Sequence, residues 1–493
     1  MKLSQIIDGI GGLVALAPVP PEANDVEITG IASDSRAVEP GYLFAAIPGV
    51  AADGAKFASA AVAAGAVAIL ASETADLAEI EDKAVILRSA NPRRALALMA
   101  ATFFGKQPTC AVAVTGTSGK TSVVEFTRQI FASAGKQAAS VGTIGIVKPD
   151  GGRYGSLTTP DPVSLHQTLA ELADEGVTHV AFEASSHGLD QHRLDGVKLT
   201  AAAFTNLGRD HLDYHANTED YLQAKLRLFR ELLQPGQTAV VNADGAEHAR
   251  VVEAAKERGL KVLSVGKAGK DLEVVSIALD GFAQKLQIAI GNKSFDARLP
   301  LIGDYQVENA LVAAGLAMAV GIDPQTAMSA MSALKGVPGR LEIIGEAREG
   351  LVVVDYAHKP EALSAALSGV RPFVKGKLVC VFGCGGDRDR GKRAIMGKIA
   401  SEEADEVIVT DDNPRSEEPG SIRAEILSGA TGAKEIGDRG EAIRTAIQGI
   451  GPGDVILIAG KGHETGQIVG DKVLPFSDHE VAREAIAKVR ADG

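Results

Sequence analysis

The chain has 493 residues, and a typical domain size of about 150 residues predicts roughly three domains. Apolar residues at 45% and charged residues at 23% are ordinary globular values, which exclude a disordered or fibrous chain. Fifty Lys and Arg against 63 Asp and Glu give a net charge of −13. This balance argues against a nucleic-acid or acidic-membrane partner, because both polyanions demand a basic face.

The N-terminal stretch MKLSQIIDGIGGLVALAPVP is interrupted early by polar and glycine residues, so we expect a mature N-terminus. The longest run of small apolar residues, 59–71, is far shorter than the roughly 20 residues that a membrane span needs. Cys110, Cys380 and Cys384 are too few for a disulfide framework, which favours a reducing cytoplasm. Cys380 and Cys384 lie four apart, but two ligands make a metal site the less favoured interpretation.

Short, nearly continuous apolar runs alternate with longer helical stretches along the chain. The runs begin at residues 110, 179, 201, 238, 351, 378, 406 and 455. This alternation predicts α/β architecture, with mostly parallel sheets covered by helices on both faces. Glycine and proline breaks at 105–108 and 334–342 predict three domains, at 1–107, 108–337 and 338–493.

The segment GTSGKTS, 116–122, follows the run at 110 and precedes a helical stretch. Its glycines let backbone N–H groups approach a phosphate, Lys120 adds a positive charge, and the Thr121 hydroxyl can ligate Mg²⁺. The position between a strand and a helix favours nucleotide binding. A glycine-rich turn with a solvated lysine is the alternative.

Glu183 ends the apolar run at 179, where a carboxylate is costly to bury unless it meets a cation such as Mg²⁺. A dense histidine set surrounds the next strand end, at His187, His192, His211 and His215. For any one of them, a hydrogen-bonded imidazole is favoured over a metal ligand.

Two further stretches leave their interpretation open. Residues 221–232 read as a helix with Lys225 among apolar residues, and the residues alone predict that this lysine reaches outward to solvent. TTPD, 158–161, can be a helix start with Pro160 or Asp161 near the cap.

The last third of the chain carries GCGGDRDRGKR at 383–393, DDNPR at 411–415 and GKGHE at 460–464. Arg415 follows a rigid proline turn, and an arginine there can hold a carboxylate with two parallel hydrogen bonds that lysine cannot reproduce. A solvated charge run remains the alternative for the first two segments. Ligands of open parallel sheets bind beyond the carboxyl ends of the strands, where these segments fall.

Taken together, these segments resemble the Mur ligase family of ATP-dependent amide-forming enzymes of peptidoglycan assembly. The resemblance runs nearly end to end, through SDSRAVEPGYLFAAIPG at 33–49, YQVENALVA at 305–313, GVPGRLE at 336–342 and DYAHKP at 355–360. It implies a small N-terminal α/β domain that binds UDP, a central P-loop-type domain that binds ATP, and a C-terminal Rossmann-like domain that binds an amino acid.

Within the family, TTPD, EASSHGLDQHR at 183–193, NLGRDHLDYH at 206–215 and the three C-terminal segments resemble the branch that extends UDP-N-acetylmuramoyl-L-alanyl-D-glutamate. The DNPR form is typical of members that add meso-diaminopimelate, and lysine-adding members usually lack that arginine. The resemblance implies ATP and Mg²⁺ as cofactors, these two small-molecule substrates, no nucleic-acid or membrane partner, and a monomer.

Site residues follow from the resemblance position by position. The catalytic set would be Lys120, Lys225 and His211, and the metal ligands Thr121, Glu183, His211 and Lys225, the last matching a lysine that the family carbamylates. Nucleotide binding would fall to Gly116, Thr117, Ser118, Gly119, Lys120, Thr121, Ser122, Asn309, Arg340 and Asp355. Many relatives carry Asn where this chain has Ser118, which shortens any side-chain contact with phosphate there.

Two substrate sets complete the expectation. The UDP-muramoyl-dipeptide would be bound by Ser35, Thr158, Thr159, Ser185, Gln191 and Arg193. The amino acid would be bound by Arg388, Asp412, Asn413, Pro414, Arg415, Gly460 and Glu464. Charge complementarity agrees, because arginines suit the far carboxylate of diaminopimelate and Glu464 suits its far ammonium.

The implied reaction passes through an acyl phosphate on the D-glutamate γ-carboxylate, and domain closure around ATP is expected. A folylpolyglutamate synthetase or lysine-adding enzyme is the nearer rival, and DDNPR speaks against both. A P-loop NTPase switch is the rival of another class, and it leaves DDNPR and GKGHE without a role.

Overall fold

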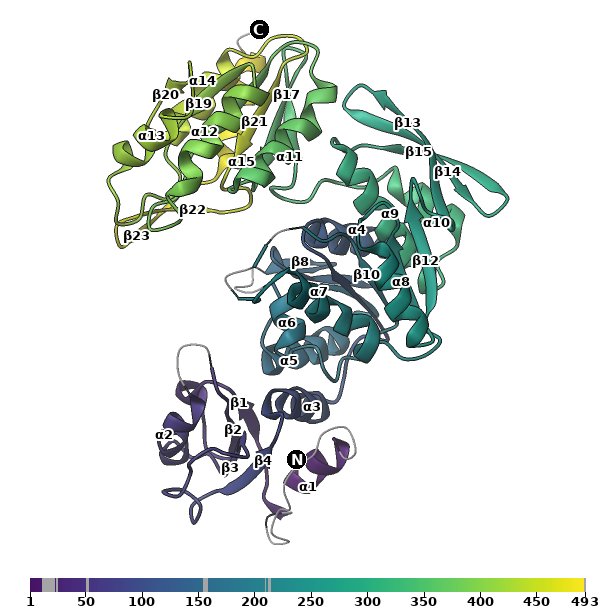
Figure 1. Ribbon diagram of the computed structural model, residues 1–493, viewed down its shortest axis with the longest axis vertical. Helices are drawn as coiled ribbons and strands as arrows, with labels where there is room; N and C mark the ends of the chain where they lie inside the picture. Colours follow the sequence, from purple (N-terminus) through teal and green to yellow (C-terminus); the bar gives the residue numbers. More distant parts are fainter. Residues whose placement is uncertain are drawn as a thin grey trace. The chain divides into compact units, whose positions relative to one another are not determined.

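The computed structural model describes residues 1–10, 23, 25–49, 53–153, 158–208, 210–211 and 214–491. The chain forms two compact units, which Figure 1 traces from purple to yellow. Unit 1 comprises Met1–Val265 and Gly315–Asp323, and unit 2 comprises Gly266–Ala314 and Pro324–Gly493. Among the described residues, every helix is too short or too polar to cross a lipid bilayer. The predicted domain boundaries at 107 and 337 stay predictions.

Unit 1 begins with a parallel sheet of order β1-β2-β3-β4. Its strands are β1 (Gly30–Ala32), β2 (Tyr42–Ala46), β3 (Ala68–Ser72) and β4 (Val85–Ser89), with 3-10 turns η2 (Ser35–Ala37) and η3 (Gly54–Phe57). Helices α1 (Leu3–Gly9) and α3 (Pro92–Phe104) pack in one apolar cluster on this sheet, and α2 (Ala58–Ala63) packs in another. Asn91 caps α3, Pro92 opens it, and the left-handed Gly105 ends it.

The second sheet of unit 1 has the order β12-β11-β10-β5-β9-β6-β7-β8. Its strands are β5 (Cys110–Thr115), β6 (Ala138–Gly142), β7 (Gly145–Lys148), β8 (Gly151–Arg153), β9 (His179–Glu183), β10 (Ala201–Phe204), β11 (Thr238–Asn242) and β12 (Lys261–Gly266). From β12 to β6 the pairing is parallel, and β6, β7 and β8 pair antiparallel. The strands predicted at 110, 179, 201 and 238 are confirmed, and their burial explains why they read as continuous apolar runs.

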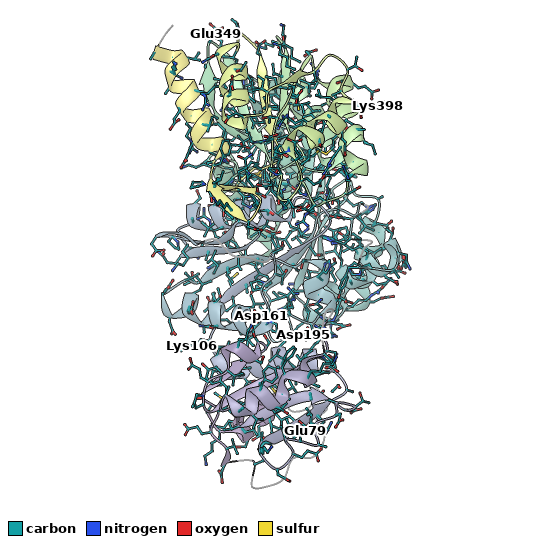
Figure 2. The ribbon with its side chains drawn as sticks, turned by 90° about the vertical axis from the view of Figure 1, so that its left-hand side faces the viewer. Glu79, Lys106, Asp161, Asp195, Glu349 and Lys398 are labelled. Atoms are coloured by element: carbon teal, nitrogen blue, oxygen red, sulfur yellow. The ribbon has the colours of Figure 1, made fainter. Side chains whose placement is uncertain are left out.

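Helices α4 (Lys120–Ser133), α5 (Pro162–Asp174), α6 (Ser186–Asp190), α7 (Thr218–Arg227) and α8 (His248–Glu257) accompany this sheet, and η4 (Leu228–Leu232) is a π-helical turn after α7. Asp161, labelled in Figure 2, caps α5 by accepting hydrogen bonds from the amides of Val163 and Ser164 at 3.1 Å each. Of the two caps left open for TTPD, the structure therefore selects Asp161. The single helix predicted over 221–232 is instead α7 plus the wider η4 turn, which buries consecutive Leu228 and Phe229.

Asp195, also labelled in Figure 2, ties several elements of unit 1 together. It is 3% exposed and accepts two hydrogen bonds from Arg227, at 2.8 and 2.7 Å. Arg94 of α3 donates to the same carboxylate at 3.1 Å. Because a buried carboxylate is stable only when it is paired, this cluster fixes the loop after α6 against α3 and α7.

Unit 2 contains an antiparallel meander of β13 (Leu272–Asp280), β14 (Ala283–Ile290) and β15 (Lys293–Leu299), followed by α9 (Asp304–Ala319) and α10 (Pro324–Met331). Its second sheet has the order β16-β17-β21-β18-β19-β20 and is parallel except at β16. The strands are β16 (Glu342–Ala347), β17 (Gly350–Asp355), β18 (Leu378–Phe382), β19 (Glu406–Val409), β20 (Lys434–Glu435) and β21 (Val455–Ala459).

Helices cover both faces of this six-stranded sheet (Figure 1). One apolar cluster contains α11 (Pro360–Val370), α12 (Gly391–Glu403), α13 (Pro419–Leu427) and the 3-10 turn η5 (Arg371–Phe373), and the other contains α14 (Arg439–Gln448) and α15 (Asp478–Ala491). A hairpin of β22 (Gly466–Val469) and β23 (Lys472–Pro475) follows β21. The strands predicted at 351, 378, 406 and 455 are confirmed, as is the α/β class.

Candidate active site

The loop between β5 and α4 is shaped by two left-handed glycines, Gly116 with φ 145° and Gly119 with φ 84°. The Thr117 amide donates to the Asn206 carbonyl at 2.9 Å, and the Ser118 amide donates to the Asn206 side-chain oxygen at 2.9 Å. These two backbone donors are therefore already engaged, and the first turn of α4, from Lys120, supplies the further amides of the predicted cradle.

We expect Gly116→Ala to destabilise unit 1 by about 3 kcal/mol or more, because the new Cβ needs both a left-handed backbone and occupied space. A Cβ at Gly116 would lie 1.9 Å from the Thr205 hydroxyl oxygen. Gly135 is the matched control, since its φ of 75° is also left-handed but nothing lies within 4 Å of its Cβ position. Gly135→Ala should cost only about 1–2 kcal/mol. Equal losses in thermal unfolding of the two variants would contradict the close approach at Gly116.

Two lysines donate hydrogen bonds to carbonyl groups of this loop. Lys120 Nζ donates to the carbonyl oxygens of Gly116 at 3.0 Å and Thr117 at 2.9 Å. Lys225 Nζ donates to the same Gly116 oxygen at 2.7 Å and lies 4.2 Å from the ring centroid of Tyr221. Lys225 is 1% exposed, so the outward orientation predicted from the residues alone is wrong. The helix turns this side chain onto the loop carbonyl, which solvates the amine in place of water.

Burial and the nearby Lys120 cation hold the pKa of Lys225 well below its ordinary value. A lowered pKa increases the share of uncharged amine, which is the form of lysine that acts as a nucleophile. Burial also raises the pKa of the neighbouring Tyr221 phenol to about 12, so that the ring stays neutral. The Tyr221 hydroxyl lies 3.2 Å from the Thr117 hydroxyl, which joins α7 to the loop.

Glu183 ends β9 beside the loop, paired in register with Val114 of β5. It is 2% exposed, and its carboxylate accepts from the Thr143 amide at 2.7 Å and the Thr143 hydroxyl at 3.3 Å. Among the described residues it has no ion-pair partner. A buried carboxylate without a protein cation, at the end of the strand that pairs with β5, fits a hard divalent cation.

His211 lies in an aromatic cluster. Its ring centroid is 4.8 Å from that of His187, and its Nε2 is 3.6 Å from an Asp210 carboxylate oxygen. Arg209, Leu212 and Asp213 of the same segment lie outside the described residues. Within the described part of the chain, no group of three or more His, Cys, Asp and Glu side chains could hold a metal by itself. A metal here would need other oxygen donors, which is usual for Mg²⁺ beside phosphates.

The residues predicted for the muramoyl dipeptide share one hydrogen-bond network that reaches Glu183. Thr159 donates to the Glu183 carbonyl at 2.8 Å and accepts from the Ser185 amide at 3.0 Å. Arg193 donates to the Thr159 carbonyl at 2.7 Å and to the Gln191 side-chain oxygen at 2.8 Å. The Thr158 hydroxyl lies 3.1 Å from that of Thr143.

Ser35 is the exception among the predicted substrate residues. It opens η2 beside the four-stranded N-terminal sheet, half-buried, where the Asp34 carboxylate caps the turn. No hydrogen bond among the described residues joins Ser35 to the network around Glu183. Its predicted contact with the uridine end stays a prediction.

Three of the residues predicted for nucleotide binding, Asn309, Arg340 and Asp355, belong to unit 2 and form one chain of contacts there. Asn309 donates to the Gln306 side chain at 3.1 Å, and Gln306 donates to the Arg340 carbonyl at 2.9 Å. The Leu341 amide then donates to Asp355 at 2.8 Å. Arg340 Nε is buried without a hydrogen-bond partner among the described residues, so a donor is available there for a ligand.

Asp355 is almost fully buried, and burial raises the pKa of its carboxyl to about 6 in spite of Arg340 and two backbone donors. The Arg340 guanidinium carbon lies 5.1 Å from the ring centroid of Tyr356, within the range of a cation–π contact. A carboxyl with a raised pKa keeps part of its protonated form, and a ligand that donates a hydrogen bond to it favours the anionic form.

A pocket of about 790 Å³ opens at the carboxyl ends of β17, β18, β19 and β21 in unit 2. The predicted amino-acid residues that line it are Arg388, Asp412, Asn413, Arg415, Gly460 and Glu464. Pro414 is not among the lining residues, and its carbonyl instead occupies the Cβ position of Gly386, 1.9 Å away. Sequence segments separated by up to about a hundred residues thus converge, because parallel strands present their carboxyl ends at one edge.

Arg415 is held at the pocket wall by its backbone. Its φ is 51°, its amide donates to the Ile468 carbonyl at 3.0 Å, and its carbonyl accepts from the Gly470 amide at 2.7 Å. Arg415 Nη1 donates to the Gly386 carbonyl at 2.9 Å. The hairpin of β22 and β23 and the glycine loop after β18 therefore orient the guanidinium from both sides.

Glu464 supplies a negative charge in this pocket, opposite in sign to Arg415. The fully buried Lys461 donates to Glu464 at 3.0 Å and to the Asn413 side-chain oxygen at 3.1 Å, and Asn413 donates to Glu464 at 3.0 Å. Burial alone would raise the pKa of Glu464, but Lys461 and Asn413 together hold it below its ordinary value. The pocket therefore presents a fixed carboxylate and the arginine donors of Arg388 and Arg415 to a ligand that carries both charges.

Family models match three successive segments of the chain. The model described as "Mur ligase family, catalytic domain" matches residues 27–104, "Mur ligase middle domain" matches 114–317, and "Mur ligase, glutamate ligase domain" matches 339–462. The chain belongs to the Mur ligase family.

Relatives of this Mur ligase include two proteins named "UDP-N-acetylmuramoyl-L-alanyl-D-glutamate--2,6-diaminopimelate ligase". The one from Brucella melitensis is 58% identical over 469 residues, covering 95% of this chain and 96% of that one. The one from Bradyrhizobium diazoefficiens is 57% identical over 475 residues, covering 96% and 97%.

Solved structures agree with the fold. A structure of a ligase with the same name superposes with a TM-score of 0.75 at 33% identity, covering 99% of each chain. The D-alanyl-D-alanyl ligase from Acinetobacter baumannii, which acts on the diaminopimelate-containing precursor by its name, superposes with a TM-score of 0.62 at 22% identity. It covers 94% of this chain and 95% of its own.

Several residues that support this Mur ligase site were given no role in the sequence analysis. Thr143 holds Glu183, Asn206 holds the loop amides, Tyr221 packs on Lys225, and Lys461 neutralises Glu464. Asn206 and Lys461 did have a sequence signal, since each stands at or directly after an apolar run and inside a quoted motif, at 206–215 and 460–464.

Proposed function

We propose that this Mur ligase couples the γ-carboxylate of the D-glutamate in UDP-N-acetylmuramoyl-L-alanyl-D-glutamate to an amino group of meso-diaminopimelate, at the expense of ATP. The observation that carries the assignment is the pocket of unit 2, where Arg415, Arg388 and Glu464 meet. Diaminopimelate carries a carboxylate and an ammonium at each end. A side chain that ends in both charges matches a pocket with both counter-charges.

The residues proposed to act on the phosphate groups lie in unit 1. The D-glutamate carboxylate attacks the terminal phosphate of ATP, so two anions must approach each other. Lys120 and the first turn of α4 supply positive potential at the loop, and the network of Thr159, Ser185 and Arg193 provides donors for the dipeptide. The acyl phosphate formed in this way is the species that the amine then attacks.

Thr121, Glu183, His211 and a modified Lys225 would hold Mg²⁺, in line with the unpaired buried carboxylate of Glu183. When bound, the ion neutralises charge on the phosphate oxygens. We further propose that the protein acts as a monomer in the cytoplasm, where ATP and the UDP-linked precursor are found together.

The direct test is phosphate release with the UDP-muramoyl-dipeptide, ATP and either meso-diaminopimelate or L-lysine. We expect release only when the dipeptide and an amino acid are both present, with strong preference for diaminopimelate. A lysine-type substrate lacks the far carboxylate and leaves Arg415 unpaired, which penalises it by roughly 10⁴-fold where the site is built to pair that group. ATP hydrolysis at the same rate without the dipeptide would instead favour an NTPase switch.

The buried position and lowered pKa of Lys225 lead to a second expectation, namely carbamylation by carbon dioxide. The amine forms a bond to the carbon of CO₂ and loses a proton, which turns a cationic side chain into an anionic oxygen ligand. We expect Lys225→Ala to lose activity by roughly 10²-fold or more, and short carboxylates such as formate to restore part of it. The measurement is ADP release with and without formate.

Lys198, an exposed lysine of unit 1, provides the control for this experiment. Lys198→Ala should keep full activity and show no response to formate. Full activity of Lys225→Ala would show that the reaction needs neither this lysine nor a carbamate on it.

A further inference from the structure

His358 lies in the short loop between β17 and α11, three residues after the end of β17, and takes no part in the function proposed above. It lines the same pocket as Arg388, Arg415 and Glu464. It is half-buried, and its ring centroid is 4.6 Å from that of Tyr356 in an edge-on arrangement. An imidazole that borders the pocket of an incoming amine can exchange a proton with it.

The hydrogen bonding of His358 defines which nitrogen carries the proton. His358 Nδ1 lies 2.8 Å from the backbone carbonyl oxygen of Tyr356. A carbonyl oxygen only accepts, so Nδ1 must be the donor. In the neutral ring the lone pair then belongs to Nε2, on the far side of the ring from the backbone.

The charged groups around the ring favour this neutral form. Burial is the main cause that lowers the pKa of His358, and the cations of Lys392 and Lys359 lower it further. Lys392 is anchored here, since its Nζ donates to the His358 carbonyl oxygen at 2.7 Å. Asp412 acts in the opposite direction, and the bond to Tyr356 also favours the charged ring, but the pKa remains below its ordinary value.

Amide formation requires a base at this place. The attacking amino group of diaminopimelate arrives as an ammonium ion, which has no lone pair with which to attack a carbonyl carbon. Glu464 is tied to Lys461 and Asn413, Asp389 caps the Gly391 amide at 2.9 Å, and burial raises the pKa of the Tyr356 phenol. Each of these three lining groups is therefore committed to another partner or protonated.

We propose that His358 is the general base of the ligation step, and that its Nε2 removes a proton from the attacking ammonium group. The inference rests on the proposed function, because it needs an amine substrate in this pocket. One N–H bond breaks and its proton passes to Nε2, and the freed nitrogen lone pair forms the C–N bond to the acyl carbon. The C–O bond to phosphate breaks with its electron pair, and phosphate takes up the second surplus proton of the nitrogen.

The variant that tests this role is His358→Asn. Asparagine places an N–H near the position of Nδ1 and can keep the bond to the Tyr356 carbonyl, but it has no basic nitrogen. His358→Gln complements it by placing an amide near Nε2. His248 offers a matched control, because its Nδ1 bonds the Gly245 carbonyl at 2.9 Å in α8, outside the pocket.

The assay compares two nucleophiles in the presence of ATP and the UDP-muramoyl-dipeptide. Diaminopimelate enters as an ammonium ion, whereas hydroxylamine is uncharged at neutral pH and reacts with an acyl phosphate without help from a base. We expect His358→Asn and His358→Gln to lower kcat with diaminopimelate by about 10²–10⁴-fold, with little change in its KM. Hydroxamate formation should be close to that of the parent enzyme, and His248→Asn should match the parent with both nucleophiles.

The pH profile provides a second readout. In the parent, kcat should fall as pH decreases through the lowered pKa of His358, because the protonated ring can no longer accept a proton from the substrate. In His358→Asn this acid limb should move to higher pH, because the rate then rises only as the free amine of the substrate accumulates.

Each outcome decides between explanations. Equal loss of the diaminopimelate and hydroxylamine reactions in His358→Asn would overturn the base role in favour of a structural one. Unchanged diaminopimelate turnover in that variant would overturn it as well. The proposed function is tested separately by the parent enzyme, since failure of the parent to couple diaminopimelate would remove that function and this inference with it.

Discussion

Lys120→Ala is expected to lower ADP formation by roughly 10³-fold. In the structure, Lys120 Nζ sits at the centre of the loop after β5, bonded to the carbonyls of Gly116 and Thr117. With ATP bound, we expect these contacts to be exchanged for phosphate oxygens, which would otherwise meet the D-glutamate carboxylate unscreened. The loss should appear in kcat, measured as ADP release with saturating substrates.

The control for this prediction is again Lys198→Ala, which removes an exposed positive charge from the same unit. Thermal unfolding of both variants should stay close to that of the parent, because Lys120 is only partly buried and other loop contacts persist. If Lys120→Ala formed ADP at the parent rate, the assignment of the loop to phosphate chemistry would fail.

Arg415→Ala is expected to lower kcat/KM for meso-diaminopimelate by about 10²–10³-fold, in the range for truncation of one partner of a desolvated charge pair. The guanidinium is oriented by Gly386 and by the β22–β23 hairpin, so it is arranged before any ligand arrives. Turnover of L-lysine, which lacks the far carboxylate, should change far less. The ratio of the two kcat/KM values is the decisive quantity.

Arg390 is the matched control for Arg415, because it is exposed, bonds Glu425 and lies outside the lining of the pocket. Arg390→Ala should keep the parent preference for diaminopimelate. If Arg415→Ala lost activity to the same degree with both amino acids, the arginine would support the pocket structurally without binding the far carboxylate.

The parallel strands were predictable because each is buried on both faces, which demands uninterrupted apolar residues such as those of 110–115 and 455–459. The antiparallel meander of β13, β14 and β15 was not predictable in this way. Its strands are exposed on many positions, and β13 alternates buried and exposed residues only in its first half. A partly solvated strand with charged residues reads as a loop or helix when neighbours in the sheet are unknown.

The site residues also divide into those that the sequence could predict and those that it could not. Glu183 and Arg415 were singled out from their places at or after apolar runs, whereas Asp355 was named only through the family resemblance. Lys225 was different, since its helical pattern indicated a solvent-facing lysine, and the structure buries it against Gly116 and Tyr221. A residue 109 positions away in the sequence supplies the carbonyl that makes this burial possible.

Local sequence was sufficient for the strand positions, the glycine loop and the charged segments, because strand burial, left-handed turns and helix caps depend on a few neighbouring residues. The partners of the buried charges depended on the folded chain. Thr143, Asn206, Lys461 and the carbonyl that defines the tautomer of His358 act through contacts made across the sheet edges or in the local turn. Burial and hydrogen bonding of an ionisable group set its protonation state, and both are properties of the packed structure.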